Sequence, residues 1–93
     1  MSHTNDHRQD ALIKRLNRIE GQIKGIKKMV IDDKEIADIM IQLNASRAAL
    51  QKISQILLEA QADHSLMHVH DGADLTAEIE TLRRVITQYN KIN

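Results

Sequence analysis

The sequence predicts an all-α protein built from three helices. Its 93 residues contain no proline and only three glycines. Tyr89 is the single aromatic residue, so the apolar content comes almost entirely from Ile, Leu, Ala, Met and Val. Sheets favour aromatic and β-branched pairs, whereas these aliphatic residues are typical of helix bundles. We expect one small domain over residues 1–93, with a loose polar tail at residues 1–9.

The first expected helix covers about residues 10–30. Its apolar residues are spaced alternately by four and three positions, which is a heptad seam. The members of the seam are Leu12, Leu16, Ile19, Ile23, Ile26 and Val30. Gly21 interrupts the pattern, which indicates either a close backbone approach or a tolerated defect. The acidic residues within 32–35 predict a short turn before the next helix.

The second expected helix runs from near residue 33 to residue 66. Some thirty helical residues would span about 45 Å, so one neighbour of twenty residues cannot cover the apolar face. A second chain is therefore expected to cover the excess. The sequence HDGAD at residues 70–74 predicts a break, and Asp74 or Thr76 would cap a third helix. The apolar seam of that helix is Leu75, Ile79, Leu82, Ile86 and Tyr89.

Basic charge gathers in the first expected helix, although the formal net charge of the chain is zero. Residues 8–28 contain seven Lys or Arg and only two acidic residues. This asymmetry indicates either an anionic partner or a solvated face whose cations pair with acids elsewhere. A stacking platform for single-stranded nucleic acid would need aromatic residues, whereas phosphate contacts with duplex DNA need only Arg and Lys.

The sequence lacks the motifs of several other functional classes. It has no cysteine, no serine in a recognisable nucleophile turn and no glycine-rich phosphate loop, so we do not expect an enzyme. It also has no apolar run long enough to cross a membrane and no visible signal peptide. A cytoplasmic protein with no membrane partner is therefore expected.

Two stretches resemble the copper- and nickel-sensing repressor family of the CsoR/RcnR type. They are RLNRIEGQIKGIKKMV at residues 15–30 and IQLNASRAALQKISQILLEA at residues 41–60. The resemblance implies three helices per chain, an antiparallel four-helix-bundle dimer, and a tetramer formed by two dimers. It also implies a repressor of double-stranded operator DNA whose binding an inducer weakens. Carried over by position, the candidate DNA-binding residues are Lys14, Arg15, Arg18 and Gln22. Arg47 is either a further DNA contact or half of a salt bridge at a buried edge.

The chain departs from this family at the metal-sensing positions. Relatives use a cysteine near the start of the second helix, and a histidine and a cysteine or histidine, four apart, near its end. Here these positions are Ile36, Gln61 and Ser65, none of which suits a soft or borderline metal. We therefore expect no cofactor, neither copper nor nickel or cobalt. Persulfide and formaldehyde are excluded as inducers because those relatives depend on cysteine.

Histidines near the end of the second helix allow a different metal site. His64 and His68 lie on one helix face and could bind Zn²⁺ or Ni²⁺ with a third ligand from His70, His3 or His7. However, His64 falls one residue before the family position at Ser65, about 100° round the helix. A polar helix end is the simpler interpretation, and a pH-responsive cluster is a third one.

Two functions therefore remain open. The first is a DNA-binding repressor that has lost the thiol-based sensor and responds to an unknown small molecule or metal, or to none. The second is a helical oligomeric scaffold without operator binding. The presence of Arg15, Arg18 and Gln22 in the resembling stretch favours the repressor.

Overall fold

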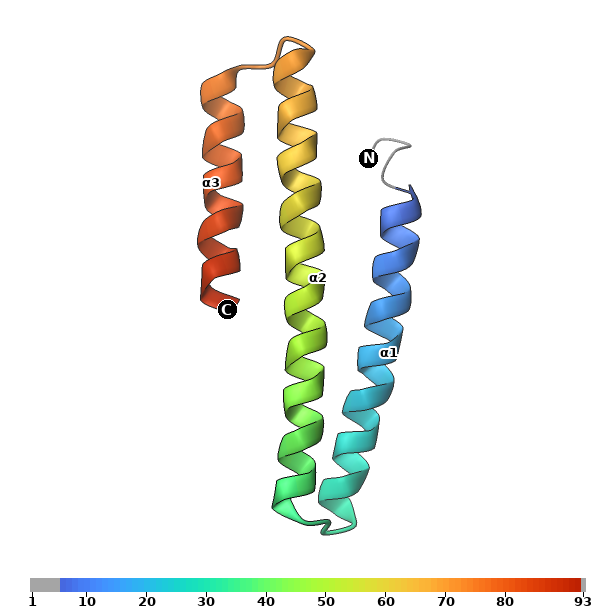
Figure 1. The fold of residues 1–93 in the computed structure, drawn as a ribbon. Coiled ribbons are helices and arrows are strands. Elements are labelled where there is room, and N and C mark those ends of the chain that lie inside the picture. Colours follow the sequence, from blue (N-terminus) through green and yellow to red (C-terminus); the bar gives the residue numbers. More distant parts are fainter. Residues whose placement is uncertain (1–5, 93) are drawn as a thin grey trace. The chain divides into compact units, whose positions relative to one another are not determined.

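The structure, a computed structural model, describes residues 6–92, with side chains from Arg8 onward. It contains three α-helices joined by two short turns (Figure 1): α1 at Asp6–Ile31, α2 at Ile36–His70 and α3 at Leu75–Ile92. No strand occurs in the described range. The prediction of an all-α chain with three helices is therefore confirmed. The chain divides into two compact units, Met1–Leu50 and Gln51–Asn93, so α2 contributes to both.

The bounds of two helices differ from those expected. α1 begins at Asp6, so residues 6–9 are helical and do not belong to a loose tail. These polar residues include no proline or glycine, so nothing in the sequence stops the helix there. α2 continues to His70, four residues beyond its expected end, and therefore contains all three clustered histidines. Residues 1–5, which include His3, lie outside the described residues.

The turn after α1 forms at residues 32–35, as the sequence predicts. The amide of Lys34 donates to the carbonyl of Met29 at 2.9 Å, and the amide of Asp33 donates to that of Val30 at 3.2 Å. These two bonds form a Schellman motif, which satisfies carbonyls that the helix end leaves without partners. The motif places its central residue in the left-handed region, and Asp33 accordingly has a φ of 53°.

The turn after α2 repeats this motif with glycine at its centre. The amide of Gly72 donates to the carbonyl of Val69 at 3.1 Å, and the amide of Ala73 donates to that of His68 at 2.8 Å. Gly72 has a φ of 98°, which residues with a Cβ rarely adopt. The expected break at residues 70–74 is therefore confirmed, and its cause is the helix-ending motif at Gly72.

Replacing Gly72 by alanine is expected to lower the free energy of unfolding by about 1 kcal/mol, because alanine is strained in the left-handed region. Gly21→Ala is the matched control, since a Cβ at Gly21 would meet nothing within 4 Å. This open space favours the tolerated-defect interpretation of Gly21, and alanine there should raise the free energy by up to about 1 kcal/mol. Urea denaturation at one protein concentration measures both. Shifts of the same sign would contradict the assigned turn.

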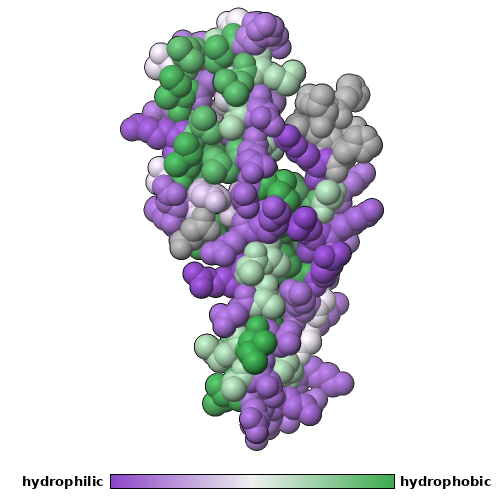
Figure 2. All heavy atoms as spheres, in the orientation of Figure 1, coloured by the Kyte–Doolittle hydropathy of each residue, from purple (hydrophilic) through white to green (hydrophobic). Residues whose placement is uncertain are grey.

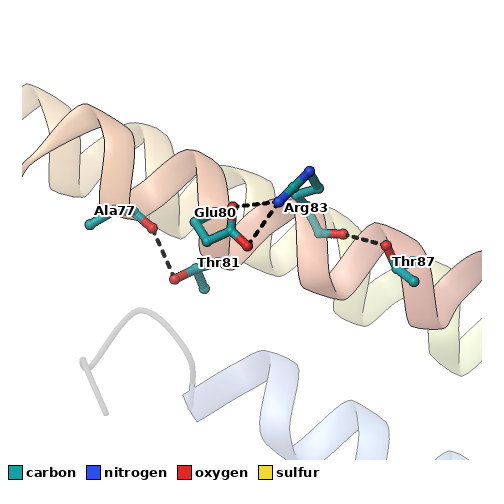
Figure 3. Close-up of polar contacts among 5 residues, drawn as sticks. All are labelled: Ala77, Glu80, Thr81, Arg83 and Thr87. Carbon is teal, nitrogen blue, oxygen red and sulfur yellow. Dashed lines mark hydrogen bonds and ion pairs between the residues drawn. The ribbon is translucent and has the colours of Figure 1, made fainter.

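α3 begins at the predicted cap. The carbonyl of Asp74 accepts a hydrogen bond from the amide of Glu78 at 3.1 Å, so Asp74 and not Thr76 starts the helix. Two threonine hydroxyls on α3 donate to backbone carbonyls one turn earlier, at 3.1 and 3.0 Å (Figure 3). Between them, Arg83 donates to both carboxylate oxygens of Glu80 at 3.1 and 2.9 Å.

The heptad seam of α1 separates into two rows. Ile19 and Ile26 are buried, with exposed fractions of 6% and 9%, and form the buried row. Leu16, Ile23 and Val30 form the open row, with exposed fractions of 46%, 50% and 61%. Residues seven apart share one helix face, and the described residues cover only one of the two faces. The heptad pattern alone does not distinguish the two rows.

The second unit is an antiparallel hairpin of the C-terminal part of α2 and α3 (Figure 1). α3 has no buried residue, and Figure 2 shows apolar side chains gathered on the surface of this hairpin. Leu66 and Ile79, for example, expose 71% and 55% of their surface. Exposed apolar patches of this kind mark interaction surfaces. None of the helices in the described range is long and apolar enough to cross a membrane.

Candidate nucleic-acid interface

The candidate DNA-binding cations of α1 lie in the first unit. Lys14 and Arg18 are exposed and one turn apart, so they share a helix face, whereas Arg15 is half-buried. None of the three side chains forms an ion pair or hydrogen bond with another described residue. Their positive charges are therefore not neutralised by acids within the described chain, and they can attract phosphates.

Further basic residues extend along the same helix. Lys24, Lys27 and Lys28 are all exposed. The Nζ of Lys24 lies 3.9 Å from the Oε1 of Glu20, but both side chains are largely exposed to solvent. Such surface pairs contribute little to stability, so another anion can easily replace Glu20 as the partner of Lys24. The exposed lysines therefore add to the positive potential of α1.

Gln22 has a structural partner that the sequence did not indicate. It is half-buried, and its Oε1 accepts a hydrogen bond from the hydroxyl of Ser46 at 3.2 Å. Ser46 is buried, with an exposed fraction of 4%, so this bond ties α1 to α2 inside the first unit. The side chain of Gln22 is thus at least partly committed to holding the two helices together. Its amide Nε2 has no partner among the described residues and can donate to DNA in the predicted contact.

Arg47 follows Ser46 on α2 and is exposed. The sequence left two roles open for it, a DNA contact and a salt bridge at a buried edge. The structure shows no ion pair between Arg47 and any described residue. The salt bridge is therefore not made within the described part of a single chain, and Arg47 is another exposed cation of the first unit.

The positions that the resemblance assigns to the metal ligands hold side chains of a different chemistry. In the second unit, the Nε2 of Gln61 donates a hydrogen bond to the hydroxyl of Ser65 at 3.0 Å, and Ser65 is 5% exposed. Ile36, in the first unit, is the first residue of α2 and is 77% exposed. An amide, a hydroxyl and an alkyl group do not provide the thiolate and imidazole ligands that copper or nickel requires. These residues therefore do not fit the metal that the resemblance implies.

The histidines at the end of α2 contact one another and α3. The rings of His64 and His68 lie with centroids 3.9 Å apart, and the Nδ1 of His68 is 3.4 Å from a carboxylate oxygen of Glu78. His70 is the exposed last residue of α2. Within the described residues, no three His, Asp or Glu side chains are placed to hold a metal ion. Glu78 lies across the turn from His68 and belongs to no motif, so nothing in the sequence identifies it as a partner of His68.

Comparison with known proteins identifies relatives over almost the whole chain. A family profile described as metal-sensitive transcriptional repressor matches residues 8–88. The copper-sensing transcriptional repressor CsoR of Bacillus subtilis is 33% identical over 91 residues, which cover 98% of this chain and 90% of that protein.

Two solved structures share the fold. The copper-sensing repressor CsoR with Cu(I) from Geobacillus thermodenitrificans has a TM-score of 0.85 and 34% identity, and the match covers 97% of this chain and 94% of that one. The nickel-responsive transcriptional regulator InrS has a TM-score of 0.80 and 26% identity, with 86% and 90% covered. The relatives are transcriptional repressors and not enzymes. The chain belongs to the metal-sensitive transcriptional repressor family, as its first and second helices indicate.

Proposed function

We propose that the chain is a repressor that binds double-stranded operator DNA through the basic face of α1. The observation that supports this most directly is that Lys14, Arg15 and Arg18 have no acidic partner among the described residues. Unpaired cations on one helix are suited to phosphate contacts, which supply much of the affinity of DNA-binding proteins. Gln22 and Arg47 complete the proposed surface, and the site of action is the cytoplasm.

The proposed repressor acts as an oligomer. The open row of α1 leaves Leu16, Ile23 and Val30 about half exposed or more, which favours a second chain that covers them. An antiparallel four-helix bundle formed by α1 and α2 of two chains would bury this row, and two such dimers would form a tetramer. Such an assembly would present several copies of the basic face to one operator.

The proposed repressor does not use the family's metal sensor. The hydrogen bond between Gln61 and Ser65 supports this, because both polar groups already have a partner. We propose that the effector is a molecule other than copper, nickel or cobalt, or that repression is constitutive. A site built from His3, His64, His68 and His70 is the remaining metal alternative.

The test is a double variant, Arg15→Ala with Arg18→Ala. Fluorescence anisotropy with the DNA upstream of this protein's own gene would be measured over about 50 to 200 mM salt. Removing two phosphate contacts is expected to weaken binding strongly and to reduce the salt slope by about two. The matched control is Arg83→Ala with Arg84→Ala on α3, which removes the same charge and should leave the slope unchanged.

Either of two results would count against this proposal. Equal effects of the two double variants would mean that α1 makes no specific contact. An unaltered chain that self-associates but binds no operator would favour the alternative function, a helical scaffold.

A further inference from the structure

A buried hydroxyl on α2 is joined to the proposed DNA-binding face of α1. Ser46 is 4% exposed, and its hydroxyl donates to the Oε1 of Gln22 at 3.2 Å. Both residues belong to the first unit. On α1, Gln22 lies three residues after Ile19 and four before Ile26, so its side chain leaves the helix beside the buried row. The bond therefore lies at the edge of the core of this unit.

The bond of Ser46 differs from those of three other hydroxyls. Ser54, Thr81 and Thr87 donate to backbone carbonyls of their own helices at 2.7, 3.1 and 3.0 Å. Such local bonds satisfy a hydroxyl without help from another helix. Ser46 instead donates to a side chain 24 residues away. Its hydroxyl therefore restricts the rotation of a second residue, Gln22.

Gln22 lies on the same side of α1 as two candidate DNA-binding cations. Arg15 is seven residues before it and Arg18 is four residues before it, and these spacings place the three side chains on one helix face. Ile23, in the open row, follows Gln22 directly and points about 100° away round the helix. A second chain that covers the open row therefore does not need to cover Gln22.

The bond with Ser46 decides which group of Gln22 can face DNA. A glutamine amide has a carbonyl oxygen that accepts hydrogen bonds and an NH₂ group that donates them. A glutamine that reads adenine uses both groups at once, because this base presents a donor beside an acceptor. The Oε1 of Gln22 is directed at Ser46, whereas its Nε2 has no partner among the described residues. Gln22 therefore presents a donor to DNA.

We propose that Ser46 is a positioning residue that fixes Gln22 as a hydrogen-bond donor toward an acceptor on DNA. This inference rests on the proposed function, because it concerns the same face of α1. Two acceptors have the required chemistry, a phosphate oxygen and the acceptor edge of a guanine. A side chain that is already oriented loses less conformational entropy on binding, so the bond with Ser46 increases the affinity for DNA.

The test is a double-mutant cycle of Ser46→Ala and Gln22→Ala. Binding to the DNA upstream of this protein's own gene would be measured by fluorescence anisotropy. Ser46→Ala alone is expected to weaken binding about fivefold, because the amide is no longer held. The salt slope should stay the same, because no charge is removed. In the Gln22→Ala background, Ser46→Ala should have no further effect, because the residue through which it acts is absent.

Ser54→Ala is the matched control for the loss of a hydroxyl. Ser54 donates to a carbonyl of its own helix, so this variant should bind the operator like the unaltered chain. Circular dichroism would verify that every variant remains helical.

An unrelated duplex of the same length distinguishes the two acceptors. An equal loss on both duplexes with Gln22→Ala would assign Nε2 to a phosphate, whereas a loss confined to the operator would assign it to a base edge. Either result supports a donor at Gln22.

Three results would overturn the role of Ser46 and leave the proposed repressor intact. The first is an equal loss from Ser46→Ala with and without Gln22, which would make Ser46 a packing residue. The second is unchanged or tighter operator binding by Ser46→Ala, which would mean that the bond does not assist Gln22. The third is an equal loss in Ser54→Ala. An unaltered chain that binds no operator would contradict the proposed function, and the role of Ser46 with it.

Discussion

Replacement of Ile23 by glutamate is expected to convert the oligomer into single chains. Ile23 lies in the middle of the open row and is half exposed in one chain. In a two-fold symmetric dimer each substitution occurs twice, so two carboxylates would be buried in an apolar seam. An unpaired buried charge costs several kcal/mol, which is enough to raise the dissociation constant by roughly 10³-fold or more.

The measurement is sedimentation equilibrium or light scattering after gel filtration. The unaltered chain should have a mass that is a multiple of 10.6 kDa, and the Ile23→Glu variant should have the mass of one chain. Ile41→Glu is the matched control, because Ile41 is also exposed, with an exposed fraction of 61%. Ile41 lies five residues before the buried Ser46, so the two side chains point in directions about 140° apart around the axis of α2. An unchanged mass for Ile23→Glu would mean that the open row is not the interface.

Restoring the family's ligands is expected to produce the second large effect. The triple variant Ile36→Cys, Gln61→His and Ser65→Cys places two thiols and an imidazole at the positions that the resemblance assigns to the metal. Thiolates are the preferred ligands of Cu(I), so affinity for Cu(I) should rise by roughly 10³-fold or more over the unaltered chain. If metal binding still lowers the affinity for DNA in this fold, Cu(I) should then release the triple variant from the operator.

The control for the triple variant has the same three ligand types, but one cysteine is placed at a different position. Ile41→Cys replaces Ile36→Cys, with the other two substitutions unchanged, so the number of thiols is the same. Competition with a Cu(I) chelator would compare the two variants. Equal Cu(I) affinities of the two variants would show that the metal binds to cysteines regardless of their position and that Ile36 is not at a sensor position. Tight Cu(I) binding by the unaltered chain would contradict the loss of the sensor.

Much of the fold could be predicted from the sequence because local signals determine it. The alternating four and three spacing predicts helices, and the absence of proline leaves only two places where they end. Gly72 and Asp74 specify the second turn through a left-handed backbone and a helix cap. The start of α1 was predicted too late, because residues 6–9 are polar but contain nothing that stops a helix.

The details of the candidate site were less predictable because they depend on pairs of residues that are distant in the sequence. The bond between Ser46 and Gln22 joins residues 24 apart, and neither carries a signal of the other. The same holds for His68 and Glu78, which meet only because the turn folds α3 against α2. The division of the α1 seam into a buried and an open row depends on which neighbours are present, and spacing alone cannot supply that information.

We propose above that this chain binds operator DNA and does not use the family's metal sensor. The most direct test of this proposal is fluorescence anisotropy of the unaltered protein with the DNA upstream of its own gene, at two salt concentrations and with Cu(I), Ni²⁺, Co²⁺ and Zn²⁺ in turn. Tight binding that weakens steeply with salt and that none of the metals changes is the predicted result. Release of the DNA by any one of these metals, or no binding at either salt concentration, would contradict the account.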